Sequence, residues 1–137
     1  MPNHCYQEVS IIGPWPIVSR LHECAVVSAP EDRRFCDVVI PIPLSEVNNW
    51  YDWCIQNWGT KWDVHWVEVV DEYEKSGDLA SFTFRCCTAW APPVPVWDRL
   101  VQELDCIVTA DYHDEGGLFE GRYNCCNDER WKPEEVH

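Results

Sequence analysis

Basic side chains are scarce in this sequence of 137 residues. Ten Lys and Arg stand against 24 Asp and Glu, which gives a formal net charge of −14. Nucleic acids and anionic bilayers attract basic surfaces, so the charge argues against direct binding to either. Long apolar runs are also missing, since none approaches the ~20 residues that a membrane span requires. The length fits one domain, and 46% hydrophobic residues suffice for a packed core.

The start of the chain lacks the basic and then apolar pattern of a secretory signal. We therefore expect a cytoplasmic protein, in which reduced thiols are the default. The nine cysteines include two adjacent pairs, Cys86-Cys87 and Cys125-Cys126. Structural zinc sites space paired ligands two to four residues apart, and adjacent strand residues point to opposite faces. This pattern favours free, buried thiols without metal or cofactor. Cross-strand zinc ligation, with His113 or His4 added, is the alternative.

Apolar periodicity and turn residues predict five strands and three helices. The strands are expected at 5–13, 64–70, 79–90, 106–113 and 118–125, and the helices at 16–25, 45–58 and 95–104. Residues 35–44 contain two prolines, which predicts an extended segment at a sheet edge. Residues 71–78 are predicted to form an acidic hairpin loop, and 127–137 a charged, frayed tail.

The order of these elements is typical of a ferredoxin-like fold. Strand, helix, strand, strand, helix, strand predicts an α+β domain with an antiparallel sheet and helices on one face. The helix at 45–58 is an insertion before the second strand, and the fifth strand is a C-terminal addition. We expect a single domain over residues 1–126.

Several short motifs follow one another along the chain. They are Pro41-Ile42-Pro43, Tyr51-Asp52-Trp53, Asn57-Trp58-Gly59-Thr60-Lys61-Trp62-Asp63, Thr88-Ala89-Trp90-Ala91-Pro92-Pro93, Tyr112, Asp114-Glu115-Gly116 and Phe119-Glu120-Gly121. From Met1-Pro2-Asn3 to about Tyr123, their order resembles the YubB-like, ferredoxin-like domain family of phages and plasmids. The resemblance implies a mobile-element origin and the ferredoxin-like fold, without a defined biochemical role. This chain departs from the family in its high cysteine content, its long acidic hairpin and its extra Gly117.

The motif residues lie where predicted elements end, and several of these ends meet in a ferredoxin-like sheet. The expected ligand or interaction site consists of Asn57, Trp58, Lys61, Trp62, Trp90 and Glu115. One interpretation is an aromatic pocket for a nucleotide or another small ligand, with Lys61 meeting a phosphate or carboxylate. The other is that the tryptophans fill the core and the lysine lays its stem over an indole.

Acidic residues form clusters that predict an interaction surface. Its members are Glu68, Asp71, Glu72, Glu74, Asp78, Asp111, Asp114 and Glu120. An anionic face of this kind is steered into a basic groove, although acidic runs also serve solubility alone. Gly-rich phosphate loops, nucleophile elbows and metalloprotease helix motifs are missing, so we expect no enzymatic activity.

These observations predict a non-enzymatic, protein-binding module of a mobile element. Its expected partner is a host protein with a basic surface. The expected effect is inhibition of a host nucleic-acid-handling defence complex, such as a CRISPR effector. A domain that binds a small ligand or nucleotide through the Trp and Lys side chains is the alternative.

Overall fold

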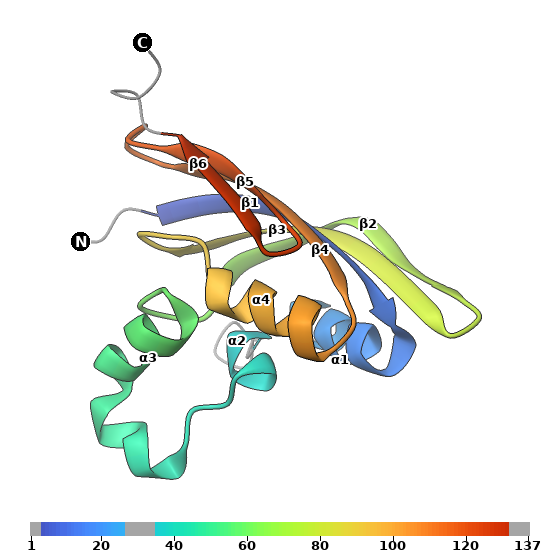
Figure 1. Cartoon of the computed structure of the whole chain (residues 1–137), viewed down its shortest axis with the longest axis horizontal. Coiled ribbons are helices and arrows are strands. Elements are labelled where there is room, and N and C mark those ends of the chain that lie inside the picture. The colour runs from blue at the N-terminus through green and yellow to red at the C-terminus, as the bar shows by residue number, and fades with distance from the viewer. Residues whose placement is uncertain (1–3, 27–34, 132–137) are drawn as a thin grey trace.

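The computed structural model describes residues 4–26 and 35–131, and these form an α+β fold (Figure 1). The elements in chain order are β1 (His4–Pro14), α1 (Trp15–Val26), α2 (Phe35–Val39), the 3₁₀ helix η2 (Leu44–Asn49), α3 (Trp50–Trp58), β2 (His65–Ser76), β3 (Leu79–Ala89), α4 (Val94–Glu103), β4 (Ile107–Asp114), β5 (Glu120–Asn124) and β6 (Asn127–Trp131). None of the described helices is long and apolar enough to cross a membrane.

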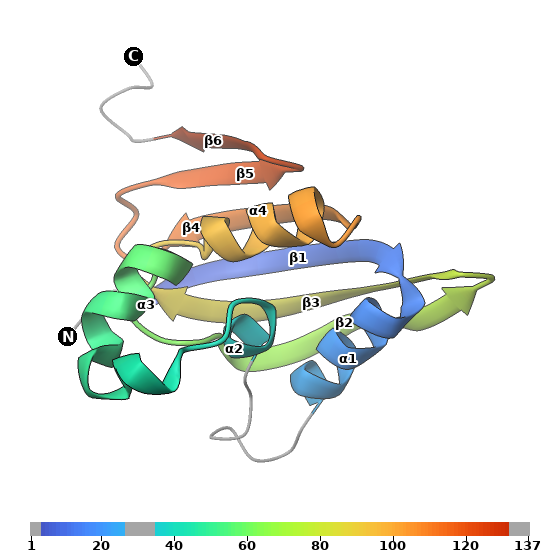
Figure 2. The same ribbon diagram turned by 60° about the horizontal axis from the view of Figure 1, so that its bottom comes forward.

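All six strands belong to one antiparallel sheet in the order β2-β3-β1-β4-β5-β6. Helices α1, α2, α3 and α4 lie on the same side of this sheet (Figures 1 and 2). The opposite side, called the open face here, is covered by no described helix. The predicted α+β class and antiparallel sheet are confirmed, with six strands in place of the five expected.

The core lies between the sheet and the helices. Phe84 of β3 packs against Phe35 of α2 with ring centroids 5.2 Å apart, and Phe35 contacts Trp97 of α4 at 5.7 Å. All three rings are buried. Removing such a ring costs ~3–5 kcal/mol, so these contacts hold α2 and α4 on the sheet.

The predicted extended segment at 35–44 is wrong over its first half, which forms α2. The carboxylate of Asp63 accepts the N–H groups of Cys36 at 2.7 Å and Asp37 at 3.1 Å, next to the helix start. A carboxylate there satisfies N–H groups that a short helix leaves unpaired. This partner comes from a distant part of the chain, which local pattern analysis does not detect.

The predicted acidic loop at 71–78 is also wrong, because β2 continues to Ser76. Only Gly77 and Asp78 separate β2 from β3, and Gly77 has the positive φ of 62° that a tight turn needs. The predicted frayed tail begins at Asn127, whereas residues 127–131 form β6. Residues 132–137 lie outside the described residues, as do residues 29–34, for which the charged sequence APEDRR predicts a loop.

Candidate functional site

Three aromatic rings surround the ammonium group of Lys61. Its Nζ lies 5.1 Å from the ring centroid of Tyr51, 5.6 Å from that of Trp62 and 5.7 Å from that of Trp90. Tyr51 belongs to α3, whereas the other rings lie in the connections after α3 and β3. Gly59 ends α3 with a φ of 75°, which turns the chain toward the sheet. The structure therefore brings together three of the predicted residues, Lys61, Trp62 and Trp90.

The backbone of Trp90 has a conformation that bulky residues rarely adopt. Its φ is 69°, and the N–H of Ala91 donates to the carbonyl oxygen of Ala89 at 2.8 Å. This hydrogen bond closes a γ-turn around Trp90, and a γ-turn with positive central φ is rare and strained. The turn takes Trp90 out of β3 and leaves it 40% exposed.

Two threonines hold this turn in place. The hydroxyl of Thr60 donates to the carbonyl oxygen of Ala89 and accepts its N–H, each at 2.9 Å. The hydroxyl of Thr88 donates to the carbonyl oxygen of Ala91 at 2.6 Å and accepts a hydrogen bond from Gln7 at 2.7 Å. Both threonines are buried. Backbone strain of ~1–3 kcal/mol persists only where the surroundings fix the conformation, and these bonds do so here.

Six exposed apolar side chains of η2, α3 and the turn after β3 are together called the aromatic lobe here. Its members are Leu44, Val47, Trp50, Tyr51, Ile55 and Trp90. Tyr51 connects Trp50 and Trp90, since its ring lies 6.0 Å from that of Trp50 and 6.5 Å from that of Trp90. Leu44 is 92% exposed. Helical spacing alone predicted one stripe through Val47, Trp50, Tyr51, Cys54 and Trp58, but only Cys54 and Trp58 are buried.

Two predicted site residues have structural roles instead. Trp58 is 3% exposed, and its indole N–H donates to the carbonyl oxygen of Ile40 at 2.8 Å. The side-chain amide of Asn57 donates to the carbonyl oxygen of Trp53 at 2.9 Å, within its own helix. Trp58 is therefore part of the core, and Asn57 is bound to the backbone of α3.

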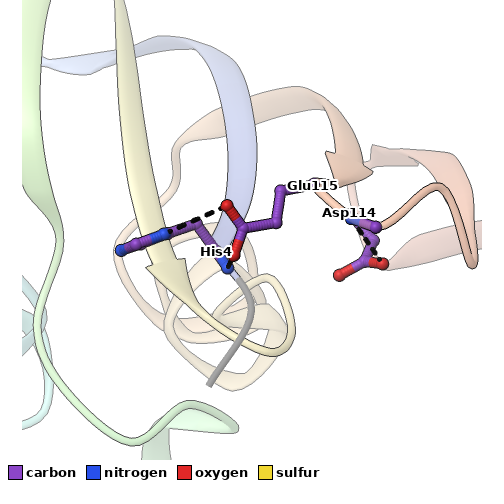
Figure 3. Close-up of polar contacts among 4 residues, drawn as sticks. His4, Asp114 and Glu115 are labelled. Carbon is purple, nitrogen blue, oxygen red and sulfur yellow. Dashed lines mark hydrogen bonds and ion pairs between the residues drawn. The ribbon is translucent and has the colours of Figure 1, made fainter. Parts of the chain in front are cut away.

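Glu115 contacts His4, which lies next to Trp62 (Figure 3). Its carboxylate accepts the backbone N–H of His4 at 2.8 Å and lies 3.4 Å from Nδ1 of the ring. The backbone N–H, and then the ring, lower the pKa of Glu115. The His4 ring is 6.3 Å from that of Trp62. Glu115 thus fixes the start of β1 beside the aromatic rings that surround Lys61.

The predicted acidic residues have different environments. Five of them, Glu68, Asp71, Glu72, Glu74 and Asp78, are exposed on β2 and the hairpin turn. The hairpin projects at the opposite end of the sheet from α3 (Figure 2). Asp114 is only 4% exposed, and its carboxylate accepts the N–H groups of Gly116 and Leu118 at 3.1 and 3.2 Å. Asp114 therefore shapes the turn and does not belong to the acidic surface.

Asp111 and Glu120 lie on the open face. Asp111 forms a bidentate ion pair with Arg122, at 2.7 and 3.1 Å, which lowers the pKa of its carboxyl. Both acidic residues line a depression of about 1030 Å³ over the middle of the sheet. Lys61, Trp62 and Trp90 do not line it. The aromatic rings around Lys61 and this depression are thus separate features.

The cysteines are free thiols, and Cys86 and Cys87 point to opposite faces of β3, as the alternation predicts. Burial raises the pKa of Cys87 to about 11 and that of Cys5 to about 12, which keeps both protonated at neutral pH. Within residues 4–26 and 35–131, no group of three or more His, Cys, Asp or Glu side chains is arranged to hold a metal ion.

Comparisons of the chain with protein-family models, with curated proteins and with solved structures give no match. The resemblance to the YubB-like family therefore stays a prediction from short motifs.

Proposed function

We propose that this chain is a non-enzymatic module that binds another protein through the aromatic lobe. The observation that carries the proposal is the exposed indole of Trp90 in its strained, doubly supported turn. Strained backbone clusters at binding and active sites, where geometry matters more than stability. Exposed patches of aromatic and aliphatic side chains mark interaction surfaces, and Trp and Tyr are enriched among the residues that dominate binding energy.

The expected partner surface has an apolar socket surrounded by basic residues. Leu44, Trp50 and Trp90 offer the apolar side chains, and the net charge of −14 attracts a basic rim. A second copy of the chain fits poorly, because two such charges repel each other. A contact between surfaces suits the lobe better than a small-ligand pocket, since the depression of about 1030 Å³ lies elsewhere.

We extend the proposal to the fold family and the biological role. The chain order β1-α1-β2-β3-α4-β4 and the sheet order β4-β1-β3-β2 support a ferredoxin-like unit. Helices α2, η2 and α3 are then an insertion before β2, and β5 and β6 an added hairpin. The proposed role is that of a mobile-element protein in the cytoplasm that inhibits a host nucleic-acid-handling defence complex.

Site-specific cross-linking tests the contact surface. A photoreactive phenylalanine analogue at position 50, which lies in the lobe, should cross-link to a partner in a lysate of the source cell. Excess unlabelled wild-type chain should compete, whereas the variant Leu44→Asp should not. Leu118→Asp is the matched control, because Leu118 is 63% exposed and lies outside the lobe. Equal competition by both variants would contradict the proposal.

A further inference from the structure

We propose that the open face of the sheet is a second docking surface, which takes a basic segment of a partner protein. The strand register aligns one charged residue from every strand in a single row across this face, called the charge row here. In spatial order the row is Glu68, Arg85, Glu8, Asp111, Arg122 and Glu129. It contains four carboxylates against two guanidinium groups. The row therefore has a net charge of −2, and its two surplus carboxylates, Glu68 and Glu129, lie on the edge strands β2 and β6.

The centre of the charge row brings two like charges together. Glu8 of β1 and Asp111 of β4 are direct cross-strand neighbours, an arrangement that destabilises a sheet. Each carboxylate has an arginine on its outer side: Arg85 lies 3.1 Å from Glu8, and Arg122 pairs with Asp111. The two arginines lessen the repulsion without separating the carboxylates. A cation from another molecule would complete this arrangement.

The next row toward the end of the sheet supplies aromatic surface. The rings of Tyr6 and His113 lie 5.3 Å apart and line the depression together with Glu120. The carboxylate of Glu120 makes no hydrogen bond or ion pair with another described residue. A lysine or arginine of a partner would lay its stem on the rings and reach this carboxylate with its head group.

The charges select the chemical class of the occupant. Both arginines of the charge row are already paired with carboxylates, so the face offers no cation to a phosphate. The described residues also lack a group that could hold a metal ion. A positively charged polypeptide segment would pair with the carboxylates of Glu68, Glu120 and Glu129. None of the three has a cationic partner among the described residues, and Glu129 accepts only an amide hydrogen bond from Asn127 at 3.5 Å.

The depression is wide enough for one helix. Its lining extends from Arg85 on β3 to Glu129 on β6, which is four strand spacings or ~19 Å. An α-helix with its side chains is ~10–12 Å wide. A helix laid on a sheet face is also how the opposite side of this sheet is covered. We therefore expect a basic helix along the open face.

The open face is continuous with the aromatic rings around Lys61. The His4 ring lies 6.3 Å from Trp62 on one side and 6.3 Å from Tyr6 on the other. The rings of Trp62, His4 and Tyr6 thus lead from Lys61 around the end of β1 into the depression. One partner can contact both surfaces, although each is made of different residues.

A titration with a synthetic peptide tests the inference. The probe is a 20-residue helical peptide of Ala, Leu and Lys, with its lysines on one face, measured by calorimetry and by NMR. The open-face variant Glu68→Gln/Glu120→Gln/Glu129→Gln removes three exposed carboxylates. The control variant Glu23→Gln/Glu72→Gln/Asp105→Asn removes three exposed carboxylates elsewhere, so both have the same net charge.

The open-face variant should bind the peptide about tenfold more weakly than the wild type. The affinity of the control variant should stay within about twofold of the wild-type value. NMR signals of Tyr6 and His113 should shift in the wild type. Equal losses in both variants would show attraction to the whole acidic chain and overturn the inference, as would tighter binding of a single-stranded oligonucleotide. The lobe variant Leu44→Asp should bind the peptide normally, so failure of the lobe and of the open face are distinguishable.

Discussion

The hydroxyl of Thr60 bridges both backbone polar groups of Ala89, with two hydrogen bonds of 2.9 Å. This contact joins the connection after α3 to the end of β3, immediately before the strained turn at Trp90. The lobe is thus fixed to the sheet by a buried side chain that takes no part in its surface.

Thr60→Val should destabilise the fold and loosen the Trp90 turn. The change keeps the shape of the side chain but removes both hydrogen bonds. The carbonyl oxygen of Ala89 keeps the N–H of Ala91, whereas the N–H of Ala89 loses its bond to the hydroxyl, at a cost of ~1–3 kcal/mol. Urea unfolding measures the loss. Thr60→Ser keeps the hydroxyl and is the control. Equal stability of the valine variant and the wild type would show that the bridge is dispensable.

The variant Trp90→Gly should be more stable than Trp90→Ala, whereas glycine is usually the less stable of the two substitutions. Glycine accepts a φ of 69° without strain, whereas alanine does not. We therefore expect the glycine variant to be more stable than the alanine variant by ~1 kcal/mol. Thermal unfolding of the pair checks this. A more stable alanine variant would mean that the turn relaxes when the indole is absent.

The pH dependence of stability should include a contribution from Glu115. Its pKa in the folded chain lies below the ordinary value of 4.5, because the N–H of His4 stabilises the carboxylate. This contribution is present above about pH 4.5 and is lost as the pH falls through the folded pKa. Unfolding of wild type and Glu115→Gln between pH 3 and 7 measures it. The advantage of the wild type should shrink on acidification, and a constant difference would contradict the assignment.

Thiol reactivity should follow burial. Cys126 is exposed, whereas Cys36 and Cys86 are fully buried and have a pKa raised well above the ordinary value of 9.0. A thiol reagent should modify Cys126 first and leave the core cysteines unmodified until the chain unfolds. The variant Cys126→Ser should lose the first phase. Rapid modification of all nine thiols in the native protein would contradict the packing of the core.

Local sequence patterns predicted the elements whose signals are local. Periodicity located α1 and α4, and alternating apolar residues located β1, β3 and β4. Helix α2 depends on the Asp63 carboxylate, which approaches from beyond α3. Strand β6 follows a turn in which Cys125 and Cys126 both have positive φ, a conformation that Asn and Gly usually signal.

The candidate site was predictable in part for the same reason. Lys61, Trp62 and Trp90 stood out because their residue types are distinctive, and the fold brings them together. Tyr51 was assigned to a helical stripe that periodicity treats as buried, although one side of α3 has no neighbour to cover it. The charge row requires the register of all six strands, which no single segment encodes.

The affinity of Trp90→Gly for the cross-linked partner tests the central claim most directly. This substitution relieves the strained φ, so the variant stays folded while it loses the exposed indole. The proposal predicts at least about tenfold weaker binding than the wild type, because a central aromatic anchor dominates such a contact, with Leu118→Asp unchanged. Wild-type affinity of a folded Trp90→Gly variant would contradict the claim that the aromatic lobe is the binding surface.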